Sequence, residues 1–216
     1  GWYTLSLHDA LPILKPEATP ADVEKLCREA AEHGFAAVCV NPIFVELSAG
    51  LIKGTNVGLA TVVGFPLGAT TTSIKTREAW EAIKQGATEI DMVMSVGFFK
   101  GGNLVAVQRD IAEVVRVAEG KIVKVILETS LLTPDEIAEA SRLAADAGAA
   151  YVKTSTGFGS RGASVEDVKK MKEAVGERCL IKASGGIRTR EVALAMVEAG
   201  ASRIGTSAGV AIVKSS

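Results

Sequence analysis

The chain has 216 residues, with 24 Lys and Arg against 25 Asp and Glu, and 48% of its residues are hydrophobic. This composition is typical of one globular domain, and it disfavours a disordered chain or a nucleic-acid-binding surface. With only three cysteines and two histidines, a disulfide framework or a histidine-rich metal centre is not expected, so lysines, carboxylates, hydroxyls and backbone amides must carry any chemistry.

The apolar stretches are short. The segment 57–66 is among the longest, and it falls well below the roughly 20 residues that a membrane-spanning helix needs. No charged segment leads into the apolar core of a signal peptide. We therefore expect a cytoplasmic protein with neither a membrane nor a nucleic-acid partner.

Along the chain, amphipathic helices alternate with apolar strands. Helices are predicted where a capping residue or a proline opens an amphipathic run, at 21–33, 74–85, 104–119, 135–147 and after Ser164. Ser164, with Asp167 three residues later, resembles a capping box. Strands are predicted at 38–40, 58–66, 90–93, 121–129, 151–152, 178–184 and Ile204, with an eighth expected near the N-terminus.

A repeated phrase organises these elements. A helix ends at a glycine, and a β-branched run follows, at Gly34, Gly86, Gly148 and Gly200. Each interval is long enough for two strand-helix units of about 25–30 residues. Continuous apolar strands that alternate with helices indicate a parallel sheet covered on its faces. We therefore predict an α/β fold, a single (β/α)8 TIM barrel.

The repeat also places side chains in the barrel. Five residues after each repeat glycine stand Cys39, Asp91, Lys153 and Gly205, on alternate strands. Alternate strands contribute one layer of inward side chains, and active sites lie at the carboxyl ends of the strands. The pattern predicts one ring that holds a thiol, an acid and a lysine, unless the register of the four runs is a coincidence.

Two lysines stand at strand ends in this pattern. Lys153 lies in YVKTSTG, and Lys182 lies in LIKASGG one strand later. Their repulsion and burial would lower an amine pKa, and a neutral lysine forms a Schiff base with a carbonyl. Asp91 would relay a proton or form an ion pair. The non-catalytic alternative for Lys153 is a structural lysine whose amine extends to solvent. Lys124 and Glu128 share one face of their strand and are predicted to form an internal ion pair.

Two glycine-rich turns indicate an anion site. SGGIR (184–188) follows the seventh predicted strand, and GTSAG (205–209) follows the eighth. Loops after these strands often bind phosphate through backbone N–H groups at a helix N-terminus, and Arg188 would add positive charge.

The motifs EIDMV, YVKTSTGF, IKASGGIR and GTSAG, with KVILET, VVGFPLGATTT and LKPEAT, together resemble the deoxyribose-phosphate aldolase family, from about Leu14 to near the C-terminus. The resemblance implies that Lys153 forms the Schiff base, that Lys182 perturbs it and joins a proton relay, and that Asp91 exchanges the proton. It implies reversible cleavage of 2-deoxy-D-ribose 5-phosphate to glyceraldehyde 3-phosphate and acetaldehyde, without a metal or cofactor. It also implies phosphate contacts from Gly157, Gly185, Gly186, Arg188, Gly205 and Ser207.

The N-terminus departs from the family pattern. The family begins its first strand with a D-H-T-like phrase, whereas Ala10, Leu11 and Pro12 stand here. Proline cannot donate a ladder hydrogen bond. We therefore expect residues 1–13 to be a foreign leader, with strand 1 defective or replaced, and 14–216 to be the aldolase domain.

Two other functions are compatible with the residues. A phosphate-sugar isomerase or synthase barrel would use Asp91 as a base without a covalent lysine. A non-enzymatic barrel would only bind a phosphorylated ligand. For the aldolase, the expected assembly is a homodimer or a homotetramer.

Overall fold

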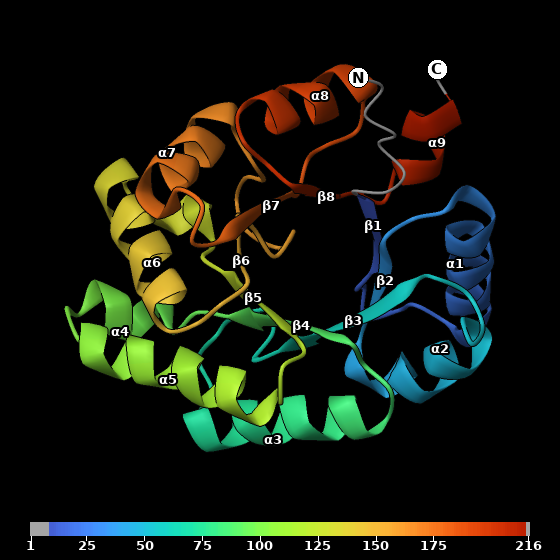
Figure 1. The fold of residues 1–216 in the computed structure, drawn as a ribbon, viewed down its shortest axis with the longest axis horizontal. Helices are drawn as coiled ribbons and strands as arrows, with labels where there is room; N and C mark the ends of the chain where they lie inside the picture. Colours follow the sequence, from blue (N-terminus) through green and yellow to red (C-terminus); the bar gives the residue numbers. More distant parts are fainter. Residues whose placement is uncertain (1–8, 215–216) are drawn as a thin grey trace.

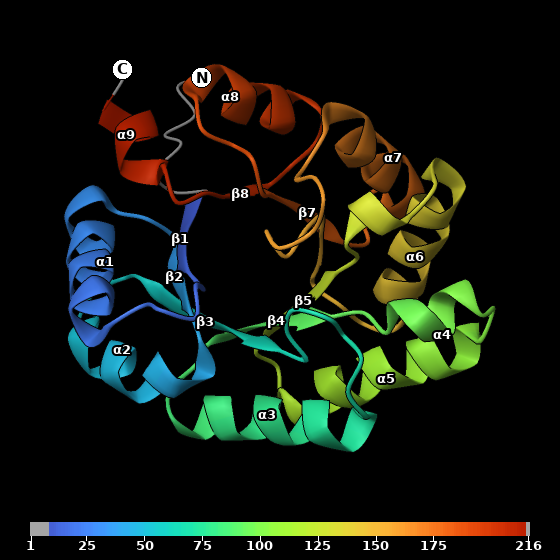
Figure 2. The ribbon, with the colours of Figure 1, turned by 180° about the vertical axis from the view of Figure 1, so that it is seen from behind.

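The computed structural model describes residues 9–214, in which eight parallel strands form a closed ring inside a layer of helices (Figures 1 and 2). Each strand pairs with the next in the sequence, and β1 pairs with β8. The predicted (β/α)8 barrel is therefore confirmed. The strands are β1 (Asp9–Ile13), β2 (Ala37–Val40), β3 (Gly58–Val63), β4 (Glu89–Val93), β5 (Ile122–Ile126), β6 (Tyr151–Lys153), β7 (Leu180–Ser184) and β8 (Arg203–Gly205).

The helices begin and end close to the predicted positions. The four repeat glycines after them all have positive φ, which L side chains rarely adopt, so the predicted helix ends are confirmed. None of the described helices is long and apolar enough to cross a membrane. The helices are α1 (Pro20–His33), α2 (Val45–Leu51), α3 (Thr72–Lys84), α4 (Val96–Lys100), α5 (Leu104–Val117), α6 (Pro134–Asp146), α7 (Val165–Val175), α8 (Arg190–Glu198) and α9 (Gly209–Lys214), with 3-10 turns η2 (Pro42–Phe44) and η3 (Thr129–Leu131).

Side-chain caps start α1, α5, α6, α7 and α8. Thr19 and Thr133 each form a capping box with the acidic residue three positions later. At α7, Ser164 Oγ accepts from the Asp167 N–H at 3.1 Å, so this half of the predicted box forms. The Asp167 carboxylate instead pairs with Arg161, because a guanidinium is a stronger partner than a backbone amide.

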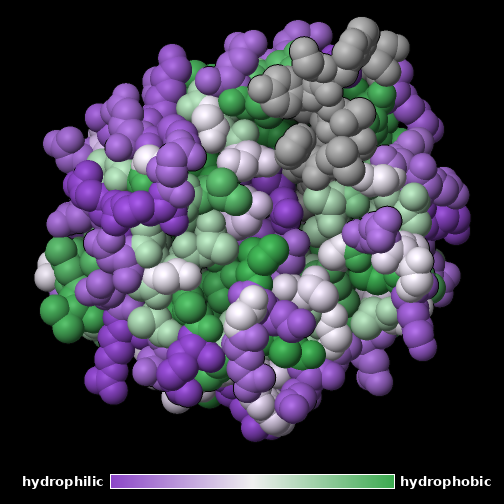
Figure 3. All heavy atoms as spheres, viewed as in Figure 1, coloured by the Kyte–Doolittle hydropathy of each residue, from purple (hydrophilic) through white to green (hydrophobic). Residues whose placement is uncertain are grey.

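The strands have two different faces. Val123, Val125 and Val152 point outward into the large core between barrel and helices, as do their counterparts on the other strands. A separate small apolar cluster of Cys39, Ala60 and Val62 lies apart from this core, with Leu14 and Phe65 packed against it. In the space-filling view of Figure 3, hydrophilic residues reach the centre of the face as well as its rim. The lumen is thus divided between an apolar part on β2 and β3 and the charged part described below.

The first strand differs from the expectation. Residues 9–13 form β1, which pairs with four residues of β2 and two of β8, so a defective strand is not what the structure has. Pairing with β8 ends at Ala10, two residues before Pro12, so the missing N–H lies beyond this seam. Residues 1–8 of the proposed leader lie outside the described residues, and the foreign origin of 1–13 stays a prediction.

Candidate active site

Three buried side chains from three strands meet in the lumen. Asp91 on β4 accepts at one oxygen, Oδ2, from Lys153 Nζ on β6 at 2.8 Å and from Lys182 Nζ on β7 at 2.9 Å. Lys153 and Lys182 are direct neighbours in the β6–β7 register. All three side chains are nearly inaccessible to solvent. The sequence prediction that these residues come together is confirmed.

A second set of charges lies beneath this trio. Lys124 donates to the other Asp91 oxygen, Oδ1, at 2.7 Å and forms an ion pair with Glu89. Arg203 donates to Glu89 at 2.6 Å, and its guanidinium lies over the Tyr151 ring. Lys124 therefore binds Asp91 at Oδ1, and Oδ2 of Asp91 is left to face the amines of Lys153 and Lys182.

The predicted ion pair between Lys124 and Glu128 is wrong. The period-two pattern holds only while the chain is a strand, and β5 ends at Ile126. Glu128 adopts a left-handed backbone conformation with φ 55°, which turns it away from the ladder. Its carboxylate contacts Thr156 instead.

Burial and neighbouring charges shift the pKa values of the trio. Burial lowers the pKa of Lys182 to about 8; Asp91 opposes this, whereas the positive charges of Lys153 and Lys124 add to it. Burial alone would raise the pKa of Asp91, but the three lysines outweigh it and hold that pKa well below its usual range. The site therefore holds a permanent carboxylate beside an amine that loses its proton near pH 8.

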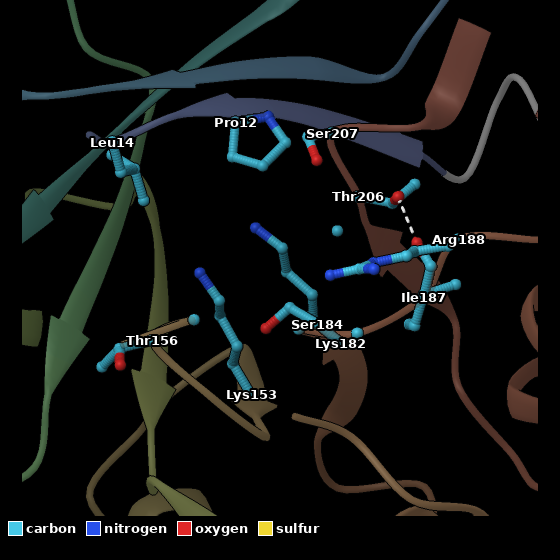
Figure 4. Close-up of a pocket in the computed structure, with 14 residues that line it drawn as sticks. Pro12, Leu14, Lys153, Thr156, Lys182, Ser184, Ile187, Arg188, Thr206 and Ser207 are labelled. Atoms are coloured by element: carbon cyan, nitrogen blue, oxygen red, sulfur yellow. Dashed lines mark hydrogen bonds between the residues drawn. The ribbon is translucent and has the colours of Figure 1, made fainter. Parts of the chain in front are cut away.

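A cavity of about 220 Å³ opens above the lysines. In Figure 4 both amines point into it from one side, and the Arg188 side chain extends toward the same space. All six predicted phosphate contacts line this cavity together with both lysines, so the structure brings the two groups into one site. The lining residues are Pro12, Leu14, Lys153, Thr156, Gly157, Lys182, Ser184, Gly185, Gly186, Ile187, Arg188, Gly205, Thr206 and Ser207.

Close backbone contacts fix the loops around the cavity. A Cβ at Gly162 would lie 2.1 Å from the Gly185 carbonyl oxygen, so only glycine allows the β6–α7 loop to pack there. Ala163 N–H donates to the carbonyls of Ser184 and Gly185 at 3.1 and 3.0 Å. Thr206 Oγ1 donates to the Ile187 carbonyl across β7 and β8. The three glycine-bearing loops are therefore held together before any ligand binds.

Cys39 also lies in the lumen, as the repeat predicted. It is fully buried in the apolar cluster, and burial together with the nearby Asp91 charge raises the pKa of its thiol. Gly205, the fourth member of the predicted ring, leaves space for Lys182, since a Cβ there would lie 3.1 Å from Lys182 Cε.

Several residues of the site were not predicted. Glu89 and Arg203 lie two positions before Asp91 and Gly205, so the same period-two argument would have placed them in the lumen. Thr156, Ser184 and Thr206 carried no signal beyond their position next to the glycine turns. Within residues 9–214, no group of three or more His, Cys, Asp or Glu side chains is placed to hold a metal ion.

Comparison with known proteins gives a consistent result. The sequence model of the DeoC/LacD family aldolases matches residues 9–215. A deoxyribose-phosphate aldolase of Thermoanaerobacter sp. strain X514 is 55% identical, over 94% of this chain and 92% of the relative. The deoxyribose-phosphate aldolase of Natranaerobius thermophilus is 57% identical, over 94% of this chain and 92% of that protein.

Solved structures agree in fold. A protein from Coccidioides immitis superposes with a TM-score of 0.96 at 44% identity, over 98% of this chain and 85% of that one. The deoxyribose phosphate aldolase of Aeropyrum pernix gives a TM-score of 0.91 at 36% identity, over 98% of this chain and 90% of that one.

Proposed function

This chain belongs to the DeoC/LacD aldolase family, and from that premise we propose that it reversibly cleaves 2-deoxy-D-ribose 5-phosphate to D-glyceraldehyde 3-phosphate and acetaldehyde through a lysine Schiff base. The observation that carries the proposal is the sharing of one Asp91 oxygen by the buried amines of Lys153 and Lys182. This arrangement brings together a nucleophile for the carbonyl, Lys153, an acid-base group, Lys182, and a fixed negative charge, Asp91.

The reaction begins at Lys153. Its neutral amine attacks C1 of the open-chain aldehyde, and water leaves to give an iminium ion. Lys182, whose pKa of about 8 makes part of it neutral near pH 7, can accept the proton that Lys153 must lose. Asp91 was expected to exchange the proton, but the three lysines hold its pKa well below its usual range, so in this proposal Asp91 stays ionised, holds both amines and stabilises the iminium charge, and Lys182 exchanges the proton.

The iminium then accepts the electron pair of the C2–C3 bond. The C3 hydroxyl loses its proton, directly or through a water molecule held by Asp91 and Lys182, and glyceraldehyde 3-phosphate leaves. The enamine that remains on Lys153 is protonated at C2. Hydrolysis of the resulting iminium releases acetaldehyde and restores the lysine. No redox partner is needed: the O–H electron pair of the C3 hydroxyl becomes the carbonyl bond of glyceraldehyde 3-phosphate, and the C2–C3 pair passes to the enamine.

The phosphate is proposed to bind at the glycine-rich wall. Gly157, Gly185 and Gly186 have positive φ, so their backbone can approach an anion where a side chain could not. Arg188 supplies the positive charge, and Ser207 a hydroxyl. Since the phosphate and the reacting aldehyde are at opposite ends of the sugar, this wall would set the distance from C1 to Lys153.

The oligomeric state and the cellular location are also proposed. The solved structure from Aeropyrum pernix is described as tetrameric, which supports a homodimer or homotetramer for this chain. A cytoplasmic location fits the metabolic role and stays a prediction.

Borohydride trapping tests the proposed function. Treatment with deoxyribose 5-phosphate or acetaldehyde should reduce the iminium to a stable secondary amine on Lys153, located by peptide mass mapping. Lys153→Leu and a sample without substrate are the controls. A label on Lys182, or no label on an active enzyme, would contradict the assignment, and the second result would favour an isomerase or synthase with Asp91 as base. Phosphate binding without turnover would favour a non-enzymatic barrel.

A further inference from the structure

Glu128 is buried at the carboxyl end of β5 in a conformation that is unfavourable for it. With φ 55° and ψ 66°, its backbone is left-handed, which glycine adopts readily and glutamate rarely. The side chain is 6% exposed, and a buried carboxylate is costly unless it is used. Glu119 is the other described non-glycine residue with positive φ, at 49°, and it is exposed. Glu128 thus combines an unfavourable backbone with an unfavourable burial.

The carboxylate of Glu128 holds one loop. Its Oε2 accepts from the hydroxyl of Thr156 and from the Thr156 N–H at 3.4 Å. Thr156 Oγ1 in turn accepts from the Phe158 N–H at 3.0 Å. Gly157, which lines the cavity, lies between these two tied residues. This series of hydrogen bonds, from Glu128 through Thr156 to Phe158, therefore fixes the backbone on both sides of Gly157, a predicted phosphate contact.

Neighbouring contacts leave this carboxylate little freedom. A Cβ at Gly159 would lie 2.9 Å from Glu128 Oε1, so the loop closes tightly over the second oxygen. Arg161, farther along the same loop, donates to the Thr129 carbonyl at 3.1 Å. Residues 128 and 129 are thus the fixed base to which the loop after Lys153 is attached at two places.

The role of Glu128 is geometric. It does not line the cavity, so it acts through Thr156 and Gly157. A negative charge near an anion site would weaken anion binding through space. Its presence there is explained by the charge-assisted hydrogen bond to Thr156, which is stronger than a neutral one.

We propose that Glu128 is a positioning residue, which sets the loop 156–159 so that the Gly157 backbone meets the phosphate of the substrate. This inference rests on the proposed function for the identity of the substrate. It makes Glu128 a determinant of the preference for a phosphorylated over an unphosphorylated sugar.

Two substitutions separate the carboxylate from the backbone. Glu128→Gly removes the side chain but suits the left-handed conformation, so the turn should still fold. We expect KM for deoxyribose 5-phosphate to rise about tenfold, the loss of one charge-assisted hydrogen bond. KM for unphosphorylated deoxyribose should rise much less. Glu128→Gln keeps an oxygen within reach of Thr156, and its KM should rise only about two- to threefold.

The matched control is Glu119→Gly, the same replacement at an exposed left-handed position. Its KM for both substrates should equal that of the wild type. Thr156→Val removes the hydroxyl, and a further Glu128→Gly change in that background should add little, since both act on one contact. Melting temperatures of all variants show whether they are folded.

Three results would overturn the proposal. These are equal losses on both substrates, a tighter binding of the phosphorylated substrate by Glu128→Gly, and additive effects with Thr156→Val. Calorimetric binding of inorganic phosphate to the same variants makes the test independent of turnover. A wild type that binds phosphate but does not cleave the sugar would refute the proposed function alone, whereas unchanged phosphate affinity in Glu128→Gly would refute the positioning role alone.

Discussion

Lys75 on α3 and Lys182 on β7 are both buried, but their surroundings differ. Lys75 Nζ lies outside the barrel and donates to Asp110 at 2.6 Å, to Ser95 at 2.9 Å and to the Val93 carbonyl at 3.0 Å. An ammonium group has three N–H donors, so all of them are used. Lys182 donates to one oxygen of Asp91, which it shares with Lys153.

The difference shows what makes a buried lysine structural or chemical. Around Lys75 one carboxylate faces one ammonium, and neutral acceptors complete the shell. Around Asp91 one carboxylate faces three ammonium groups, of which only Lys124 has a second carboxylate. Burial of the amine, together with the positive charges of Lys153 and Lys124, outweighs the attraction of Asp91, and the pKa of Lys182 falls to about 8.

The largest effect should come from removing the nucleophile. Lys153→Leu should lose activity by roughly three orders of magnitude or more, because covalent catalysis is gone. Turnover of deoxyribose 5-phosphate by purified protein, with a melting curve to show folding, measures this. A variant that keeps one tenth of the wild-type rate would remove Lys153 from the mechanism.

Removing Lys75, whose charge is balanced by Asp110, should lower the stability of the fold and leave the reaction unchanged. Lys75→Met leaves Asp110 buried without its cation, and the free energy of unfolding should fall by about 3–5 kcal/mol. The folded fraction should keep its KM. Urea titration measures the loss, and a double variant Lys75→Met with Asp110→Leu should recover part of it. No recovery would mean that packing, not charge, dominates at this position.

Removing Lys182 should change the free energy of unfolding in the opposite direction. Lys182→Met removes a buried cation that is disfavoured at pH 7, so the free energy of unfolding should rise by ~1–3 kcal/mol while kcat falls. Lys182 has a lowered pKa in the folded state, so the cost is complete below about pH 8 and disappears as the pH approaches the unfolded value of 10.5. The advantage of the variant should therefore shrink between pH 8 and 10. A variant less stable than wild type at pH 7 would contradict this account.

The same titration should appear in the rate. If neutral Lys182 accepts the proton from Lys153, kcat/KM should rise with pH and level off above about pH 8. At pH 7 the rate would be roughly a tenth of its plateau. Variants of Lys75 should not move this profile, and a flat profile between pH 6 and 9 would exclude Lys182 as the base.

Glycines beside the two lysines give the smallest effects. Gly205 is a predicted phosphate contact, and a Cβ there would also lie 3.0 Å from Ser184 Cβ and 3.1 Å from Lys182 Cε. Gly205→Ala should therefore raise KM for the phosphorylated sugar and, through Lys182, lower kcat a few-fold on both sugars. A Cβ at Gly64 would lie 2.8 Å from Lys75 Cε, and Gly64→Ala should lower only stability. Gly186→Ala meets no protein atom within 4 Å, but it places a side chain on a left-handed residue with φ 77°, so it should cost some stability. It should raise KM for the phosphorylated sugar and not for the unphosphorylated one. Equal effects of Gly186→Ala on both sugars would exclude it from the phosphate wall.

Local patterns were enough to predict the barrel and its central trio. Glycine at helix ends and period-two strands are properties of short segments, so they placed Asp91, Lys153 and Lys182 at strand ends on one side of the sheet. The pairing of Lys75 with Asp110 was not predicted, because it joins α3 to α5, and no spacing rule relates two separate helices. Such contacts depend on how the helices pack on the barrel.

Two other failures have local causes. Glu128 was treated as part of a strand, although a left-handed residue ends it, and nothing in its residue type indicates that conformation. Pro12 was taken as a sign of a defective first strand, although β1 forms and Pro12 stands in register with Cys39 of β2. Whether Pro12 weakens that strand stays a prediction. The sequence rules failed where the chain leaves a regular element.

The pairing of β1 with β8 has a consequence for synthesis. These strands stand at opposite ends of the sequence, so the loop that must close to join them is nearly the whole chain. During translation the ring stays open until β8 has left the ribosome, and the surplus of lysine charge faces water, where it costs little. Closure is then the step that removes that water. We expect the pKa of Lys182 to fall only once β8 has paired with β1. The site should therefore become active only when the barrel closes.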